Sequence, residues 1–131
     1  MNIVFIAHDA KKKLMQNFCI AYRSILSKNE LYATGTTGRL IEEVTNLTIH
    51  KHLSGNLGGI QQVSAQIEHN EIDLVIFLRD PLTRGSHEAS GEDVFRICDI
   101  HNIPVATNLA SAELLIKSLD RGDLEWREMY K

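Results

Sequence analysis

Short, uninterrupted apolar runs alternate with segments of helical periodicity along the whole chain. Residues 2–7 and 73–78 contain runs without polar alternation, which is typical of strands buried on both faces of a sheet. Further strands are predicted at 31–34, 47–53 and 103–107. Helices are predicted at 10–28, at 39–44, around 60–67, from Val94 onward, and at 110–119. Five strands separated by helices predict an α/β fold with one doubly wound, five-stranded parallel sheet, right-handed crossovers and helices on both faces.

This pattern is flavodoxin-like, and the composition suits it. With 131 residues, 44% of them hydrophobic, we expect a single domain spanning 1–131. The net charge of −3 does not favour nucleic acid or an anionic membrane as partner. No apolar stretch is long enough for a signal segment or a membrane span, so we expect a cytoplasmic protein. Cys19 and Cys98 lie in apolar helical patterns and are expected to be buried thiols. The histidines show no H-E-x-x-H spacing, and we do not expect His50 and His52, which would share one face of a strand, to bind a metal.

Small polar clusters follow four of the predicted strands. They are His8-Asp9, residues 34–38 (T-G-T-T-G), Ser54-Gly55, and Asp80 with His87 beyond it. The carboxyl ends of parallel strands face one crevice, where ligands bind in open α/β sheets. Backbone N–H groups and hydroxyls at a helix start suit an anion such as phosphate. The sequence therefore predicts a site for a small phosphorylated ligand.

Each cluster also has an ordinary structural interpretation. Residues 34–38 lack P-loop and G-x-G-x-x-G spacing, and alone they are equally typical of a turn with threonine caps. His8 could lie at the core margin, Asp80 could initiate a turn before proline, and His87 could be an exposed loop histidine. Near one crevice, however, a carboxylate and an imidazole are the groups that proton transfer requires. Lys12, one turn inside the first helix, could neutralise a phosphate.

Six motifs occur in an order and at spacings that resemble methylglyoxal synthase. They are I-A-H-D, Y-A-T-G-T-T-G, S-G-N-L-G-G-I-Q-Q, L-V-I-F-L-R-D-P-L, H-E and I-P-V-A-T-N. The resemblance covers almost the whole chain and weakens in the last dozen residues. It implies a methylglyoxal synthase-like fold and a lyase that eliminates phosphate from dihydroxyacetone phosphate to give methylglyoxal, without metal or organic cofactor.

The resemblance also implies roles for individual residues. His87 would polarise the substrate carbonyl and shuttle a proton, and Asp9 and Asp80 would support the acidic centre. His8 would contact the substrate. The phosphate would be held by Lys12, Thr34, Gly35, Thr36, Thr37, Ser54 and Gly55. The family forms homohexamers in which a C-terminal arginine reaches phosphate across a subunit boundary, and Arg127 is the nearest candidate here. Inorganic phosphate is implied as a second small partner.

The sequence departs from the family at one position that is central to the chemistry. Ile60 stands where the family has its general-base aspartate, and Ile60 also continues an apolar stripe with Val63 and Ile67. Ser90 and Asn56 likewise replace a family carboxylate and a proline. Losing a positioned base typically costs about 10²–10⁴ in rate. We expect an impaired lyase, with Asp80 or Asp9 as substitute base. The alternative is a non-catalytic domain of the same fold that binds a phospholigand or serves regulation.

Overall fold

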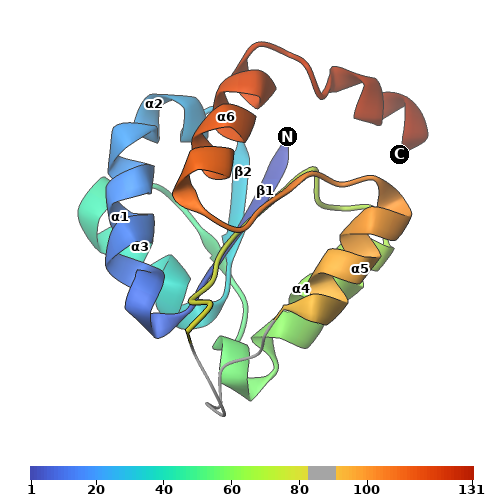
Figure 1. Cartoon of the computed structure of the whole chain (residues 1–131). Helices are drawn as coiled ribbons and strands as arrows, with labels where there is room; N and C mark the ends of the chain where they lie inside the picture. Colours follow the sequence, from blue (N-terminus) through green and yellow to red (C-terminus); the bar gives the residue numbers. More distant parts are fainter. Residues whose placement is uncertain (83–90) are drawn as a thin grey trace.

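The chain folds around a five-stranded, all-parallel sheet in the order β3-β2-β1-β4-β5 (Figure 1). The computed structural model describes residues 1–82 and 91–131, apart from the side chain of Asn56. The strands are β1 (Asn2–Ala7), β2 (Glu30–Ala33), β3 (His50–Lys51), β4 (Leu74–Leu78) and β5 (Val105–Ala106). This sheet confirms the predicted α/β fold class.

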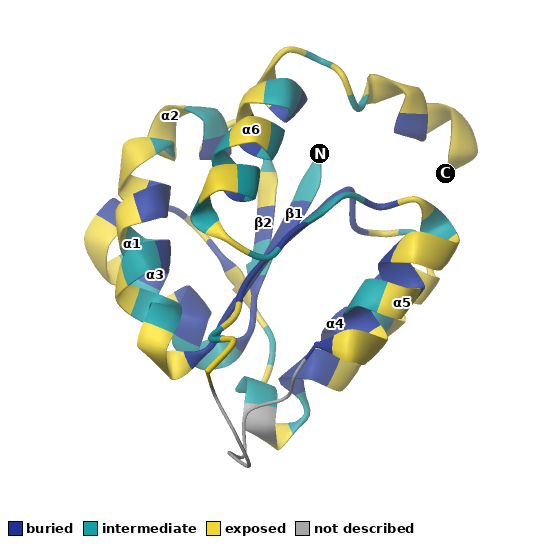
Figure 2. Ribbon diagram, viewed as in Figure 1, coloured by how far each residue is buried: buried dark blue, intermediate teal, exposed yellow. Residues whose placement is uncertain are grey.

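Helices cover both faces of the sheet, as predicted (Figures 1 and 2). The helices are α1 (Lys12–Ala21), α2 (Arg23–Leu26), α3 (Gly35–Thr45), α4 (Gly59–Glu68), α5 (Glu92–His101) and α6 (Leu109–Asp120), with 3₁₀ turns η1 (Asp9–Lys11), η2 (Gly55–Leu57) and η3 (Glu125–Tyr130). Residues of α1, α3 and α6 form one core cluster with the sheet, and residues of α4 and α5 form the other.

The central strand shows why the apolar runs predicted strands so well. Along β1, Ile3 and Phe5 belong to the core under α1, α3 and α6, whereas Val4 and Ile6 belong to the core under α4 and α5. Each is at most 3% exposed. Because both faces of the strand are covered, polar alternation would bury unpaired polar groups.

The strand order reverses direction between β1 and β4. The chain runs outward from β1 through β2 to β3, then crosses back to β4 and continues to β5 on the other side. In such sheets the crevice beyond the carboxyl ends of the strands at this point is the usual place for a ligand. The polar residues after β1 and β4 therefore lie where the fold favours binding.

Three of the predicted elements differ from the structure in ways that the backbone explains. The first predicted helix is divided, because the backbone leaves helical geometry at Tyr22 (φ −108°, ψ 23°). The predicted strand 47–53 shrinks to β3, because the N–H groups of Leu47 and Ile49 bind Thr45 Oγ1 and the Glu42 carboxylate instead of a neighbouring strand. The predicted helix 39–44 begins earlier, at Gly35.

The last turn, η3, is fixed to the amino end of the sheet by Arg127. The buried Arg127 donates from Nε to Asp73 Oδ1 at 3.1 Å, and its two other nitrogens reach Asn70 and the carbonyls of Ile72, His101 and Asn102. Asp73 immediately precedes β4, so this network lies at the opposite end of the sheet from the predicted site. The guanidinium is engaged within its own chain, which does not favour Arg127 as a phosphate ligand.

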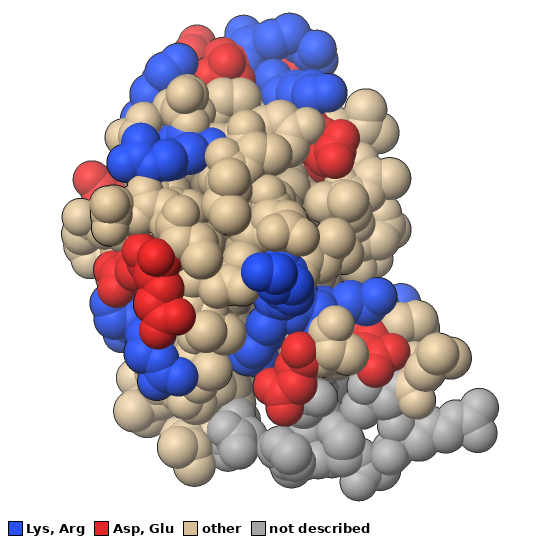
Figure 3. Space-filling view, turned by 90° about the vertical axis from the view of Figure 1, so that its left-hand side faces the viewer, with Lys and Arg blue, Asp and Glu red and all other residues tan. Residues whose placement is uncertain are grey.

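The surface carries mixed charges. On the side of the molecule shown in Figure 3, basic and acidic side chains are interspersed among uncharged ones. In the described part of the chain, no helix combines the length and apolar character needed to cross a membrane.

Candidate functional site

The clusters after β2 and β3 meet at the carboxyl edge of the sheet. Thr36 Oγ1 lies 3.1 Å from Ser54 Oγ, so the two hydroxyls share a hydrogen bond. The N–H of Gly35 donates to the carbonyl of Leu53 at 3.1 Å. We call residues 34–37 together with Ser54 and Gly55 the polar cradle. Two segments that the sequence predicts separately thus form one surface.

The cradle includes the N-terminus of α3. Thr34 is the N-cap residue, but its side chain makes no capping hydrogen bond. The first N–H groups of a helix have no acceptor within the helix, and the helix dipole adds partial positive charge there. Thr34 and Thr37 are almost buried, whereas Gly35 and Thr36 are partly accessible. Because the Gly35 N–H already donates to Leu53, the group at this helix start that is best suited to an anion is the hydroxyl of Thr36.

Two glycines permit the close approach of the cradle segments. A Cβ on Gly35 would lie 2.8 Å from the carbonyl oxygen of His52, and a Cβ on Gly59 would overlap the carbonyl oxygen of Leu53. Neither approach can relax by rotating a side chain, because both obstacles are backbone. A Cβ on Gly55, by contrast, would be in ordinary contact with Ile60 at 3.8 Å.

We expect Gly59→Ala to lower the free energy of unfolding by about 2 kcal/mol or more, since the added methyl forces the backbone apart. Gly55→Ala is the matched control and should unfold near the wild-type denaturant midpoint. Urea unfolding followed by circular dichroism measures both. Equal midpoints for wild type and Gly59→Ala would show that the backbone approach at Leu53 is not tight.

His8 and Asp80 come together between the ends of β1 and β4. The backbone N–H of His8 donates to the carbonyl of Leu78 at 3.1 Å, and the N–H of Asp80 donates to His8 Nδ1 at 2.9 Å. Since Nδ1 accepts, the neutral ring carries its proton on Nε2. The buried ring packs edge-on against Phe77. His8 is therefore a fixed donor through Nε2, and Asp80 lies beside it as predicted.

Lys12 lies at the end of β1, close to Asp9. Its Nζ donates to the carbonyl of Ala7 at 2.7 Å and forms an ion pair with Asp9 Oδ1 at 3.0 Å. The Lys12 side chain is mostly buried, whereas that of Asp9 is largely exposed. The geometry thus fixes a positive charge at the same edge of the sheet as His8.

Ile60 lies in the first turn of α4, beside the cradle, where the sequence predicts it. It is 8% exposed and belongs to the core cluster with Val4, Ile6 and Val63. Its Cγ1 would be 3.8 Å from a Cβ placed on Gly55, so the side chain lies beside this part of the cradle. The wall of the cradle at this point is an aliphatic side chain, with no group that accepts a proton.

Two predicted positions, His87 and Ser90, lie outside the described residues. Among those that are described, no three His, Cys, Asp or Glu side chains are grouped to hold a metal ion. His50 and His52 bind different partners, Glu30 and Gln66. Both cysteines are buried and free. Burial raises the pKa of the Cys19 thiol, and burial with nearby Asp99 raises that of Cys98 to about 12, so neither suits nucleophilic chemistry.

Sequence reasoning missed the contributions of the backbone. The carbonyl of Leu53 and the N–H of Asp80 position Gly35 and His8, yet any residue type could supply them. For the first of these contacts the sequence held an indirect signal, the glycine at position 35, where a Cβ would meet backbone.

The matched family model is described as the MGS-like domain and spans residues 15–107. The chain is 64% identical to a methylglyoxal synthase of Caldicellulosiruptor saccharolyticus over 129 residues, covering 98% of this chain and 92% of that protein. The chain belongs to the methylglyoxal synthase family. Its relatives in this family are lyases, and it is an enzyme of the same type.

Two further members of the family match this chain over most or all of its length. A methylglyoxal synthase of Alkaliphilus metalliredigens is 57% identical over 131 residues, covering 100% of this chain and 98% of the relative. The crystal structure of methylglyoxal synthase from Elizabethkingia anophelis NUHP1 superposes with a TM-score of 0.84 at 36% identity, covering 88% of this chain and 76% of that one. The family likeness thus holds for both sequence and fold.

Proposed function

We propose that this protein eliminates phosphate from dihydroxyacetone phosphate to give methylglyoxal, at a rate limited by Ile60. The observation that best supports this proposal is the polar cradle, where the hydroxyls of Thr36 and Ser54 meet at the start of α3. Such a surface fits the phosphate of a small substrate. High identity to proteins named methylglyoxal synthase supports the choice of substrate.

The reaction begins with removal of a proton from the carbon beside the substrate carbonyl. The resulting enediolate needs a donor on its oxygen, and expulsion of phosphate needs groups that bind the growing charge of the leaving oxygens. In this proposal the cradle and Lys12 stabilise the leaving phosphate, and His8 Nε2–H contacts the substrate. His87 polarises the carbonyl and shuttles the proton, as in the family.

The base is the weak part of this site. The aliphatic Ile60 cannot take the proton, so the substitute is a carboxylate at the crevice, Asp80 or Asp9. Asp80 Oδ1 already accepts the N–H of Leu82 at 3.0 Å, which fixes the orientation of this carboxylate. A base away from the family position is poorly aligned with the substrate, and we expect slow turnover.

We also propose the domain organisation, cofactor requirement, location and assembly of the protein. Residues 1–131 form one methylglyoxal synthase-like domain that acts without metal or organic cofactor in the cytoplasm. It assembles as a homo-oligomer, a hexamer by family resemblance, and binds inorganic phosphate as well as substrate. Light scattering of the purified protein measures the assembly.

The test of function is an assay for methylglyoxal with the purified protein and dihydroxyacetone phosphate. We expect product above the uncatalysed background at a rate well below that of a relative with the family aspartate. If phosphate binds but no product forms on long incubation, the second candidate holds. That candidate is a phospholigand-binding domain without catalysis, and the apolar wall at Ile60 favours it.

Phosphate binding can be tested separately from chemistry. Thr36→Val removes one hydroxyl and keeps the shape, so we expect inorganic phosphate to bind about tenfold more weakly, the loss of one charge-assisted hydrogen bond. Thr48→Val changes an exposed threonine away from the cradle and should bind as the wild type does. Isothermal titration calorimetry measures phosphate binding to the wild type and both variants. Equal affinity of all three proteins would show that phosphate does not bind at Thr36.

A further inference from the structure

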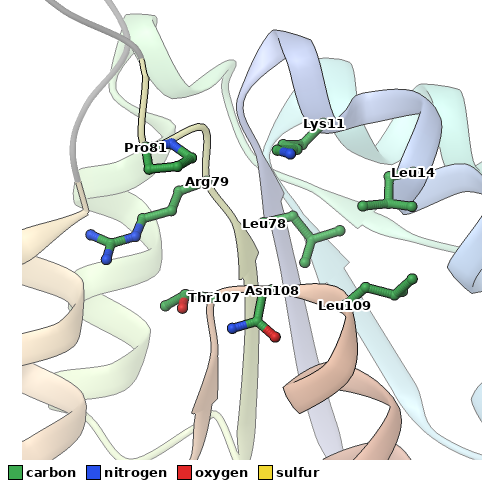
Figure 4. A pocket seen from close by; sticks show the side chains of 8 residues that line it. All are labelled: Lys11, Leu14, Leu78, Arg79, Pro81, Thr107, Asn108 and Leu109. Carbon is green, nitrogen blue, oxygen red and sulfur yellow. The ribbon is translucent and has the colours of Figure 1, made fainter.

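A second cavity lies near the end of β4, on the face of the sheet that carries α1 and α6 (Figure 4). It has a volume of about 370 Å³, within the range of small-molecule sites. It is lined by Lys11, Leu14, Leu78, Arg79, Pro81, Thr107, Asn108 and Leu109. No cradle residue is among them, so this cavity is distinct from the proposed phosphate site.

The cavity has an apolar side and a polar side. Leu78 stands between them in Figure 4, with Leu14 and Leu109 to one side and Arg79 and Thr107 to the other. The leucines offer surface that a hydrocarbon chain would cover. The polar side chains lie within the same opening and can bind the head of the same molecule.

Positive charge and donors flank the opening, with Lys11 on the α1 side of Leu78 and Arg79 on the side nearer α5 (Figure 4). Lys11 and Arg79 are both cations, and none of the described residues that line the cavity is acidic. The Arg79 guanidinium lies 5.5 Å from the centre of the Phe95 ring, a cation–π contact that limits its motion. Asn108 Oδ1 accepts the N–H of Ser111 at 3.0 Å, so its side-chain NH₂ is the group left to bind a ligand. An anionic head group matches these donors.

We propose that this cavity binds a small amphipathic anion, a carboxylate with a short unbranched apolar chain. The chain covers the three leucines, and the carboxylate lies between Lys11 and Arg79. Such a ligand contacts the residues next to Asp80 without entering the cradle. The proposal is independent of the lyase activity.

The test is a ¹H–¹⁵N NMR titration of the full chain with hexanoate. We expect saturable shifts of the amides of Leu78, Thr107 and Leu109. Hexanol, which has the same chain and no charge, should bind about tenfold more weakly, because it forms no charge-assisted hydrogen bond. Equal affinity for the alcohol, or absence of saturable shifts at these residues, would overturn the proposal.

Variants separate this cavity from the cradle. Arg79→Ala and Lys11→Ala should each weaken hexanoate binding about tenfold, with the wild-type spectrum kept elsewhere. Lys13→Ala, which removes a neighbouring exposed lysine outside the cavity, should bind as the wild type. Saturating inorganic phosphate should leave the hexanoate affinity unchanged. Competition by phosphate, with shifts at residues 34–37, would place hexanoate in the cradle and refute the second site while supporting the first.

Discussion

Ile60→Asp is expected to raise the rate of methylglyoxal formation by about 10²-fold or more, because it restores a positioned general base. Ile60 lies in the first turn of α4, beside Gly55 of the cradle. In the proposed reaction the base removes a proton from the hydroxymethyl carbon of the substrate, because only the enediolate formed on that side of the carbonyl can expel phosphate by elimination. The measurement compares both proteins with dihydroxyacetone phosphate under identical conditions.

The apolar surroundings of Ile60 oppose this gain. The side chain is buried among Val4, Ile6 and Val63, and burial of a carboxylate costs stability and raises its pKa. Gln61→Asp is the matched control, since it adds a carboxylate at an exposed neighbouring position and should leave the rate unchanged. A fast wild type whose rate Ile60→Asp does not alter would mean that another residue already serves as base.

Asp73→Asn is expected to lower the free energy of unfolding by about 3 kcal/mol, the cost of removing one partner from a buried ion pair. Asp73 is fully buried and accepts hydrogen bonds from the N–H of Asn2, from Arg127 and from Lys131. Asp123→Asn breaks the exposed pair with Arg121 and should cost under about 1 kcal/mol. Urea unfolding at pH 7 measures both losses of stability. Equal losses for the two variants would show that the buried network of Asp73 stabilises the fold no more than an exposed ion pair does.

The same carboxylate predicts a dependence on pH. Burial alone would raise the pKa of Asp73, but the hydrogen bonds from Asn2, Lys131 and Arg127 outweigh it and hold the pKa below its usual range. A lowered pKa gives stability that is complete above the unfolded value, about 3.9, and is lost as pH falls through the folded value. The difference in free energy of unfolding between the wild type and Asp73→Asn should therefore become smaller below about pH 4. A constant gap down to pH 2 would contradict this.

The sequence predicted the central strands because their physics is local. The runs at 2–7 and 73–78 are apolar since both faces are covered, and the structure has β1 and β4 there. Residues 47–53 alternate as a strand should. They pair only at His50 and Lys51 because Thr45 and Glu42 take the N–H groups of Leu47 and Ile49. Such side-chain competition depends on the folded position of α3, which periodicity does not contain.

The start of α3 was missed for a related reason. Glycine and threonine are poor helix formers, so the sequence predicted a turn through Gly38 and a helix from residue 39. Gly38 is helical, and a Cβ there would lie 2.7 Å from Lys51 Cγ. Close packing against β3, a tertiary requirement, explains the glycine better than a turn does.

The sequence predicted the separate polar clusters of the candidate site, and the structure shows which of them lie in contact. The strand-end rule brings Thr36 to Ser54 and His8 to Asp80, as observed. The cavity beside Leu78 was not predicted, because it requires α1 and α6 to lie side by side. The motif I-P-V-A-T-N ends at Thr107 and Asn108 of that cavity, but its letters do not reveal which face they line.

A crystal structure of the wild-type protein soaked with dihydroxyacetone phosphate tests the central proposal most directly. If Ile60 slows proton removal as we propose, intact substrate should accumulate in the crystal. We predict its phosphate at the first turn of α3, within hydrogen-bond distance of Thr36 and Ser54, and its carbon chain against Ile60. Substrate bound elsewhere with this cradle empty would contradict the proposal.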